Sequence, residues 1–403
     1  MENRPHNQRI VSGMRPSGRL HLGHYHGVLK NWLELQEAND CFYFVADWHA
    51  LTTDYESPGG ISEATWEMVI DWLAVGIDPE KAVLFVQSAV KQHAELNLLL
   101  SMLTPLPWLE RVPTFKDQQQ KLADRNLATY GFLGYPLLQS ADILIYKADG
   151  VPVGEDQLSH LDITRQVARR FNWLYGREAD HEAKVEASLK KMPKKAASRF
   201  KKLRSDWRES GDAEALEAGK ALLDEQANLA AEDIERLLGE LEGRGLEILP
   251  EPTPLLTPAA KFPGLDGQKM SKSYGNTIAL REDPEAVESK IRTMPTDPAR
   301  VRRSDPGTPE KCPVWELHKV YSDDDTRAWA HKGCTTAGIG CVDCKGPVIE
   351  AVLAEQEPIR RKAQELAAHP DRVWEIVHEG NRKAARIAEE TLEEVRTVMG
   401  LTR

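Results

Sequence analysis

Apolar positions near the start of the chain alternate between continuous runs and helical spacing. Continuous runs at residues 9–12, 41–46 and 83–86 are typical of buried strands. Between them, apolar side chains recur every three or four residues over 28–35 and 61–75, as they do in helices packed on one face. This alternation predicts an α/β fold, a Rossmann-like parallel sheet with helices on both faces.

A different pattern begins near residue 178 and continues to about residue 248. This segment is charged, rich in Ala and Leu, and almost without strand signal, so we expect an inserted helical hairpin. A basic run at 190–202 precedes an acidic half at 212–242. The charge pattern leaves two interpretations open, a solvated surface or a patch that faces RNA.

The chain stays helical in pattern beyond residue 280, with its longest candidate helices at 348–368 and 369–399. We therefore expect two domains. The first is a Rossmann-like catalytic domain over 1–280, which carries the insertion, and the second is a separate α-helical domain over 281–403.

Composition sets only broad limits on function. The 403 residues are 41% apolar and 29% charged, as in globular proteins, and no apolar run reaches the length of a membrane span. The first residues are polar and lack the apolar core of a signal peptide, so we expect a cytoplasmic location and no membrane partner. The net charge of -11 argues against indiscriminate binding of nucleic acid, although a local basic face stays compatible with it.

A glycine-rich turn at residues 13–24 follows the first predicted strand and precedes a helix. Such turns bind phosphates, because free backbone N–H groups and the helix dipole favour anions there. Arg19-Leu20 stands where a P-loop needs Lys followed by Ser or Thr, so that motif is excluded. What remains is the pair His21 and His24, which either donates hydrogen bonds to a phosphate or consists of two ordinary helix-entry histidines.

Carboxylates stand at three further places where a ligand could bind. Asp142 falls within the apolar stripe of a predicted helix, so either a distant residue pairs with it or a ligand N–H does. The group Asp47-Trp48-His49 follows a buried strand and is either a helix cap or part of a ligand site. Gly154-Glu155-Asp156 begins another helix, and its carboxylates either cap that helix or hold ribose hydroxyls.

Two clusters in the last third of the chain complete the candidate chemistry. Lys269 and Lys272 lie in a loop with glycines on both sides, which could close over a polyphosphate. Four cysteines, spaced C-x21-C-x6-C-x2-C, favour a metal site in a cytoplasmic chain over disulfides or four reduced structural thiols: Cys312, Cys334, Cys341 and Cys344. Zinc and a [4Fe–4S] cluster both accept four thiolates, and the spacing alone does not choose between them.

Taken together, these motifs resemble the paired signatures of class I aminoacyl-tRNA synthetases. His21-Leu22-Gly23-His24 is similar to the HIGH signature, with Leu in place of Ile, and residues 269–273 match KMSKS in full. The stretches 12–18, 135–144 and 151–157 look most similar to the bacterial tryptophanyl branch of that class. The resemblance covers about residues 8–175 and 250–403 and leaves the charged insertion outside.

The resemblance also implies roles for single residues. His21, His24, Lys269 and Lys272 would be catalytic, stabilising the reacting phosphates and the departing pyrophosphate. ATP, accompanied by Mg²⁺, would contact Arg15, Pro16, Ser17, Gly23, His24, Gly154, Glu155, Asp156, Phe262, Lys269, Met270, Ser271, Lys272 and Ser273. Tryptophan would contact Tyr135, Asp142 and Gln157, and the Asp142 carboxylate would accept the indole N–H.

The implied activity is the attachment of L-tryptophan to tRNA(Trp) through a tryptophanyl-adenylate, with release of pyrophosphate and AMP. A homodimer and an anticodon-binding role for the C-terminal helices are implied in the same way. The cysteine pattern is similar to that of relatives with a [4Fe–4S] cluster, which favours iron–sulfur over zinc. Two other functions stay open, a tyrosyl-tRNA synthetase and a non-catalytic synthetase-like regulator that binds RNA.

Overall fold

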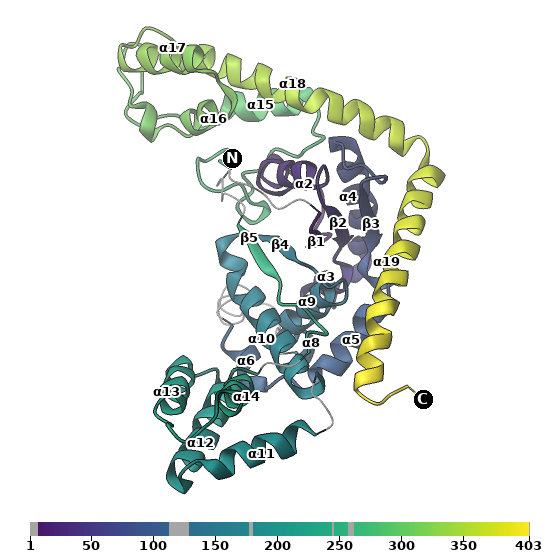
Figure 1. Ribbon diagram of the computed structural model, residues 1–403. Coiled ribbons are helices and arrows are strands. Elements are labelled where there is room, and N and C mark those ends of the chain that lie inside the picture. Colours follow the sequence, from purple (N-terminus) through teal and green to yellow (C-terminus); the bar gives the residue numbers. More distant parts are fainter. Residues whose placement is uncertain (1–6, 113–128, 177–179, 244–245, 257–261, 403) are drawn as a thin grey trace.

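The computed structural model describes residues 7–112, 129–176, 180–243, 246–256 and 262–402 (Figure 1). At its centre is a parallel sheet of five strands in the order β3-β2-β1-β4-β5. The strands are β1 (Arg9–Met14), β2 (Asp40–Val45), β3 (Ala82–Val86), β4 (Gly150–Val153) and β5 (Thr253–Leu256). This is the order of doubly wound α/β folds, so the predicted fold class is confirmed.

The apolar pattern predicts β1, β2 and β3 to within a few residues, but it does not predict β4 or β5. Each of these two strands is four residues long and contains a proline, Pro152 or Pro254. A short run broken by proline carries too few apolar positions to be distinguished from a loop.

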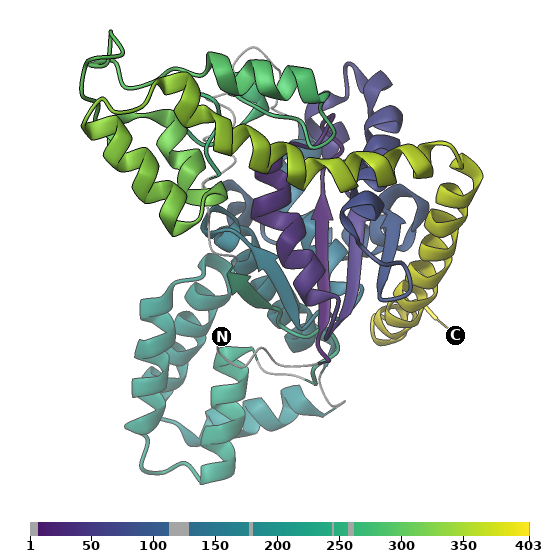
Figure 2. The ribbon, with the colours of Figure 1, turned by 90° about the horizontal axis from the view of Figure 1, so that it is seen from above.

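Successive side chains of the central strands enter two separate cores, one on each face of the sheet. On one face, Tyr43 packs with α2 (Lys30–Leu35), α4 (Ile61–Val75) and α18 (Cys341–Ala367). On the other face, Phe42 packs with α5 (Gln92–Ser101), α9 (Tyr135–Leu144), α10 (Leu158–Tyr175) and α19 (Pro370–Val398). Figures 1 and 2 show these helices on both sides of the sheet, as predicted.

The remaining helices connect this framework. Near the sheet are α1 (Leu22–His24), a π-helical turn (Tyr25–Leu29), α3 (Asp47–Asp54), α6 (Leu106–Glu110) and α8 (Tyr130–Leu133). Farther along the chain are α15 (Pro284–Thr293), α16 (Pro313–Tyr321) and α17 (Asp324–Thr335), which lie near the first half of α18 (Figure 1).

The charged insertion is not a hairpin, contrary to the sequence-based expectation. It contains α11 (His181–Lys191), α12 (Lys194–Ser210), α13 (Ala213–Asp224) and α14 (Ala231–Glu242). These helices share a core of their own around Phe200, Leu223 and Leu237. The chain can reverse after α12 because Gly211 adopts a left-handed φ of 68°, which is cheap only for glycine.

The two charged halves of the insertion pair with each other in part. Lys191 Nζ lies 2.7 Å from Asp233 Oδ2, and Arg204 Nη1 lies 2.7 Å from Glu240 Oε1. Within the predicted basic run at 190–202, Lys191 therefore stabilises the insertion from inside, and so does Lys201, whose Nζ lies 2.9 Å from Glu186 Oε1.

The helices beyond residue 280 do not stand apart from the sheet. The two longest predicted helices correspond to α18 and α19, and α19 lies against strand β3. A Cβ atom at Gly380 would sit 1.7 Å from the carbonyl oxygen of Leu84, and Asn381 Oδ1 accepts a hydrogen bond of 3.0 Å from the Val86 N–H. Among the described helices, none combines the length and the apolar character that crossing a bilayer requires.

Candidate active site

The turn after β1 places two imidazoles side by side at the start of α1. The ring centroids of His21 and His24 are 3.8 Å apart, and the His21 backbone N–H donates to His24 Nδ1 over 3.2 Å. Because Nδ1 of His24 accepts, a neutral His24 carries its proton on Nε2, which is then available as a donor. His21 Nδ1 is buried with no hydrogen-bond partner in the described part of the chain.

Both imidazoles are neutral at pH 7. Burial is the largest cause, and the ammonium of Lys272 adds to it, lowering the pKa of His21 to about 4. Burial, His21 and the two lysines lower the pKa of His24 to about 3. The neutral rings can therefore donate hydrogen bonds to an anion, while the lysines supply the positive charge of the site.

The lysine loop reaches this turn from far along the chain. Lys272 Nζ donates to the carbonyl oxygen of Ser17 over 2.9 Å, joining residues 255 positions apart. Backbone bonds fix the approach: Leu22 N donates to Ile278 O over 3.1 Å, and Leu280 N donates to Leu20 O over 2.8 Å. The two motifs thus face each other on one side of the sheet.

Asn276 holds the lysine loop in shape, and sequence reasoning missed it. Its Oδ1 accepts from the Ser271 N–H over 2.8 Å, and its Nδ2 donates to Asp266 Oδ1 over 2.7 Å and to Lys269 O over 3.2 Å. Met270 is buried below the loop, whereas Lys269, Lys272 and Ser273 are exposed. The only signal for Asn276 was a polar residue after a glycine, which many turns share.

The other predicted ATP positions are distributed around this turn. The Arg15 guanidinium donates to Thr53 Oγ1 and lies 4.0 Å from Asp54 Oδ2, so α3 partly neutralises its charge. Gly154 follows β4 and precedes the 3₁₀ turn Glu155–Gln157, Glu155 is exposed beside it, and the side chain of Asp156 lies outside the described residues. Gly23 leaves no room for a Cβ, which would lie 2.9 Å from the His21 ring and 3.4 Å from Met270 Cβ.

The side chain of Phe262, which was predicted to contact adenine, is held by packing inside the protein. The ring is buried and stacks on His26 with centroids 4.5 Å apart. His26 in turn contacts Tyr321 Oη at 3.1 Å and Glu355 Oε2 at 2.9 Å, on α16 and α18. Burial alone would raise the pKa of Glu355, but the hydrogen bonds of His26, Lys30 and Tyr321 outweigh it and lower that pKa to about 2. The helices beyond residue 280 thereby contact the π-helical turn that directly follows the histidine pair.

Asp142 on α9 is fully buried, and distant residues pair with it, which is the first of the two alternatives left open by the sequence. His93 Nδ1 and Gln87 Nε2 contact Oδ1 at 2.6 and 2.8 Å, while His49 Nε2 and Gln87 Nε2 contact Oδ2 at 2.8 and 2.9 Å. Burial would raise the pKa of Asp142, yet the hydrogen bonds from the two histidines hold it below its usual range. Asp142 is therefore a carboxylate, not a neutral acid.

The contacts around Asp142 show which roles Asp47 and His49 have in the group Asp47-Trp48-His49. Asp47 Oδ1 accepts from the backbone N–H groups of Trp48 and Ser88, so it binds the backbone at the starts of α3 and of the 3₁₀ turn Gln87–Ala89, although it is the N-cap residue of neither. His49 instead reaches Asp142, its ring centroid lies 4.3 Å from that of Tyr135, and its Nδ1 is buried without a partner in the described residues. Gln157 lies in the 3₁₀ turn Glu155–Gln157 that precedes α10. Nothing in the sequence pointed to Gln87 or His93, because their role depends on the sheet bringing three elements together.

The four C-terminal cysteines come from the starts of α16 and α18 and from α17, and all are free thiols. Burial, followed by the charges of the three other thiols, raises the pKa of Cys344 to about 12, so the four side chains lie within electrostatic range of one another. Cys344 Sγ is 3.4 Å from His318 Nε2. Nevertheless, within the described residues no three His, Cys, Asp or Glu side chains are arranged to hold a metal ion, so the thiols as placed do not fit one.

The chain is similar to known proteins along nearly its whole length. A family model described as tRNA synthetases class I (W and Y) matches residues 3–192 and 224–355 and omits part of the insertion. The chain is 61% identical to a tryptophan–tRNA ligase of Ralstonia nicotianae over 98% of this chain and 99% of that one, and 44% identical to that of Thermotoga maritima over the same shares. The structure of tryptophanyl-tRNA synthetase from Campylobacter jejuni, complexed with ADP and tryptophan, has a TM-score of 0.72 at 28% identity and covers 98% of this chain and 100% of that one. The chain belongs to the class I tRNA synthetases that serve tryptophan and tyrosine.

Proposed function

We propose that this protein is a tryptophan–tRNA ligase, which first joins L-tryptophan to AMP and then transfers the acyl group to tRNA. The observation that carries the proposal is the junction of the two signature motifs, where Lys272 reaches Ser17 beside the His21 and His24 pair. Relatives that match the whole chain and bear this name support tryptophan over tyrosine.

In the first step, the carboxylate of tryptophan attacks the α-phosphorus of ATP, and the bond to the departing pyrophosphate breaks. Such chemistry leaves a protein mainly positioning and charge stabilisation. Neutral His21 and His24 donate hydrogen bonds to the phosphates, and Lys269 and Lys272 stabilise the charge that gathers on pyrophosphate. Mg²⁺ bound to ATP supplies further charge neutralisation there.

The substrate positions extend this proposal. ATP lies along Arg15, Pro16, Ser17 and Gly23 on one side and Gly154, Glu155 and Asp156 on the other, with Phe262 near the adenine and Met270, Ser271 and Ser273 in the lysine loop. Tyr135, Asp142 and Gln157 surround tryptophan. Residues 1–280 form the catalytic domain and 281–403 the anticodon-binding domain of a cytoplasmic homodimer.

Exchange of labelled pyrophosphate into ATP tests the amino acid specificity without any RNA. We expect exchange with tryptophan and about a 100-fold or more lower kcat/KM with tyrosine, because indole and phenol differ in size and in the position of their donor hydrogen, so one pocket cannot align both with the Asp142 carboxylate. Faster exchange with tyrosine would assign the protein to the tyrosine branch. Absence of exchange with either amino acid, at several Mg²⁺ concentrations, would instead support a non-catalytic RNA-binding regulator.

The four cysteines carry a second proposal, a [4Fe–4S] cluster, for which the support is the donor set of four neighbouring free thiols. The thiols would have to move together to hold it. Protein purified anaerobically should be brown and contain iron and acid-labile sulfide, and Cys341→Ser should lose both. Colourless protein with one zinc per chain would assign a structural zinc, and protein with neither metal would make the four residues reduced thiols.

A further inference from the structure

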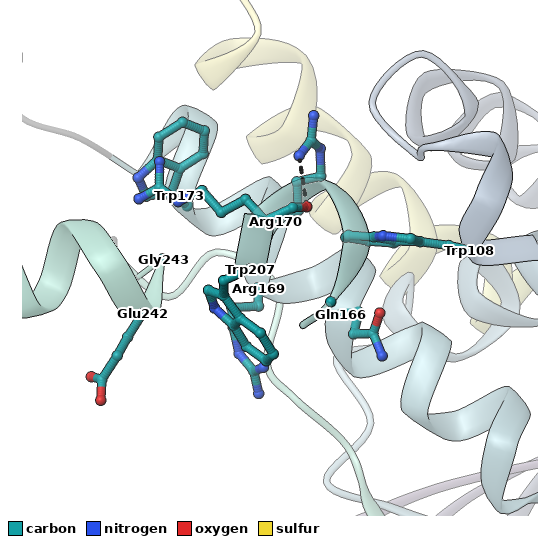
Figure 3. A pocket seen from close by; sticks show the side chains of 10 residues that line it. Trp108, Gln166, Arg169, Arg170, Trp173, Trp207, Glu242 and Gly243 are labelled. Atoms are coloured by element: carbon teal, nitrogen blue, oxygen red, sulfur yellow. Dashed lines mark hydrogen bonds between the residues drawn. The ribbon is translucent and has the colours of Figure 1, made fainter. Parts of the chain in front are cut away.

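A pocket lined by tryptophan and arginine side chains lies where the insertion meets α6 and α10, and nothing in the proposed reaction uses it (Figure 3). It is a shallow depression whose enclosed volume is about 40 Å³ and which widens to about 410 Å³ when the open space at its mouth is counted, and its walls include Trp108, Trp173 and Trp207. A second hollow of about 940 Å³ adjoins it and shares Trp207 and Arg169. The pocket is therefore one end of a longer groove between the catalytic domain and the insertion.

Two of the three arginines in the pocket are already engaged. The Arg169 guanidinium forms a bidentate ion pair with Glu251, with Nε 3.0 Å from Oε1 and Nη2 2.6 Å from Oε2. Arg208 Cζ lies over the Trp173 ring, 3.5 Å from its centroid, and Arg208 Nη1 lies 3.4 Å from Glu240 Oε1. These contacts hold the insertion against α10 and are part of the fold.

Arg170 and Gln166 have no ion pair in the described part of the chain, and each keeps one buried polar atom without a partner there. Arg170 has no carboxylate within ion-pair distance among the described residues, and its only hydrogen bond is a 3.5 Å contact with the carbonyl oxygen of Arg208. Arg170 Nε and Gln166 Oε1 are both buried and unpaired in that part of the chain. Burying a cation and an acceptor in this way costs free energy unless a ligand satisfies them.

The aromatic walls indicate what kind of ligand that is. Trp108 is held rigidly, since its Nε1–H donates to Glu209 O over 3.2 Å and its ring faces Arg170 at 5.9 Å. Trp207 is half-buried and borders both hollows. A ligand suited to this pocket has a flat ring for the tryptophans, an N–H for Gln166 and a negative group for Arg170.

We propose that the pocket binds an unpaired nucleotide of the tRNA, with the base against Trp207 and a phosphate at Arg170; this inference rests on the proposed function. A nucleotide has all three features, and stacking on aromatic side chains is how proteins hold unpaired bases. A macromolecular ligand is favoured over a free nucleotide by α12, the helix that carries Trp207. Its exposed side bears cations without carboxylate partners in the described residues: Lys194, Lys195, Arg199 and Lys202.

Kinetics of variants at position 207 test this inference. Trp207→Leu keeps an apolar side chain but removes the stacking surface, whereas Trp207→Phe keeps an aromatic ring. We expect Trp207→Leu to raise the KM for tRNA in aminoacylation about ten-fold and Trp207→Phe to stay within about three-fold of the parent. Tryptophan-dependent pyrophosphate exchange, which needs no RNA, and the thermal midpoint should be the same in both variants as in the parent.

The outcomes separate the two proposals. If the parent shows no exchange, the proposed function fails. If exchange is present but the KM for tRNA is unchanged in Trp207→Leu, this inference fails. Binding of UMP that competes with tRNA as strongly as a short single-stranded RNA at equal concentration, and that Trp207→Leu abolishes, would also overturn it in favour of a free nucleotide. A loss of tRNA binding that Trp207→Phe shares fully with Trp207→Leu would make Trp207 a packing residue of the insertion.

Discussion

Replacing Asp142 with alanine is expected to lower the free energy of unfolding by about 3–5 kcal/mol and kcat/KM for tryptophan by about 100-fold or more. The stability loss follows because His49, Gln87 and His93 would be left as buried donors without an acceptor. The kinetic loss follows if the carboxylate also accepts the indole N–H. Urea unfolding and tryptophan-dependent pyrophosphate exchange measure the two effects separately.

A matched control distinguishes recognition from folding. Asp297 is also buried and accepts backbone N–H groups of Ala299 and Thr308 at 3.0 and 2.7 Å, but it lies outside the candidate site. Asp297→Asn should reduce stability while leaving the KM for tryptophan unchanged. Equal kinetic losses in both variants would mean that Asp142 acts through the fold alone.

An analogue of tryptophan with sulfur in place of the indole nitrogen sharpens the test. A carboxylate has about four acceptor positions, and Asp142 already receives four hydrogen bonds. Binding of the indole N–H therefore requires one donor to be displaced, and His49 lies beside Tyr135. The parent should discriminate against the analogue and Asp142→Ala should not. Equal discrimination by both proteins would contradict the assignment of Asp142 as the residue that recognises indole.

Replacing Lys272 with alanine is expected to lower kcat for pyrophosphate exchange by about 100- to 1000-fold, as removal of one charge-stabilising donor does in other enzymes. Because the side chain is exposed, the free energy of unfolding should change by less than about 0.5 kcal/mol. Rapid-quench and steady-state exchange assays report kcat directly. Lys91→Ala, an exposed lysine outside the candidate site, is the control and should keep full activity. A kcat within three-fold of the parent would remove Lys272 from the mechanism.

The sequence predicted those features that depend on local pattern. The alternation of runs and helical spacing was enough for β1 to β3, and the two signature motifs were found because their residue types and order are specific. Features made by packing were not accessible in this way. His93 and Gln87 approach Asp142 only because β3, α5 and α9 are adjacent, and Asn276 holds its loop through three contacts that no spacing reveals.

In the insertion, too, the sequence predicted the local pattern but not the packing. Its charge and helical character were evident, but the number of helices depends on where turns interrupt them, and Gly211 was one glycine among many in the sequence. The pocket around Arg170 arises between segments that are distant in the chain, and its lining includes both Trp108 and Trp207. Such a site becomes visible only when the insertion is placed against the sheet domain.

The contact between α19 and β3 has a consequence for how the chain matures. β3 is an edge strand, and an unprotected edge presents free backbone groups on which another chain can form a strand. Asn381 occupies the Val86 N–H and Gly380 covers the Leu84 carbonyl, so α19 protects that edge. Asn381 stands 295 positions after Val86 in the sequence, so it is synthesised long after the strand that it protects. Until α19 has been synthesised and has docked, each nascent chain carries a sheet edge open to aggregation.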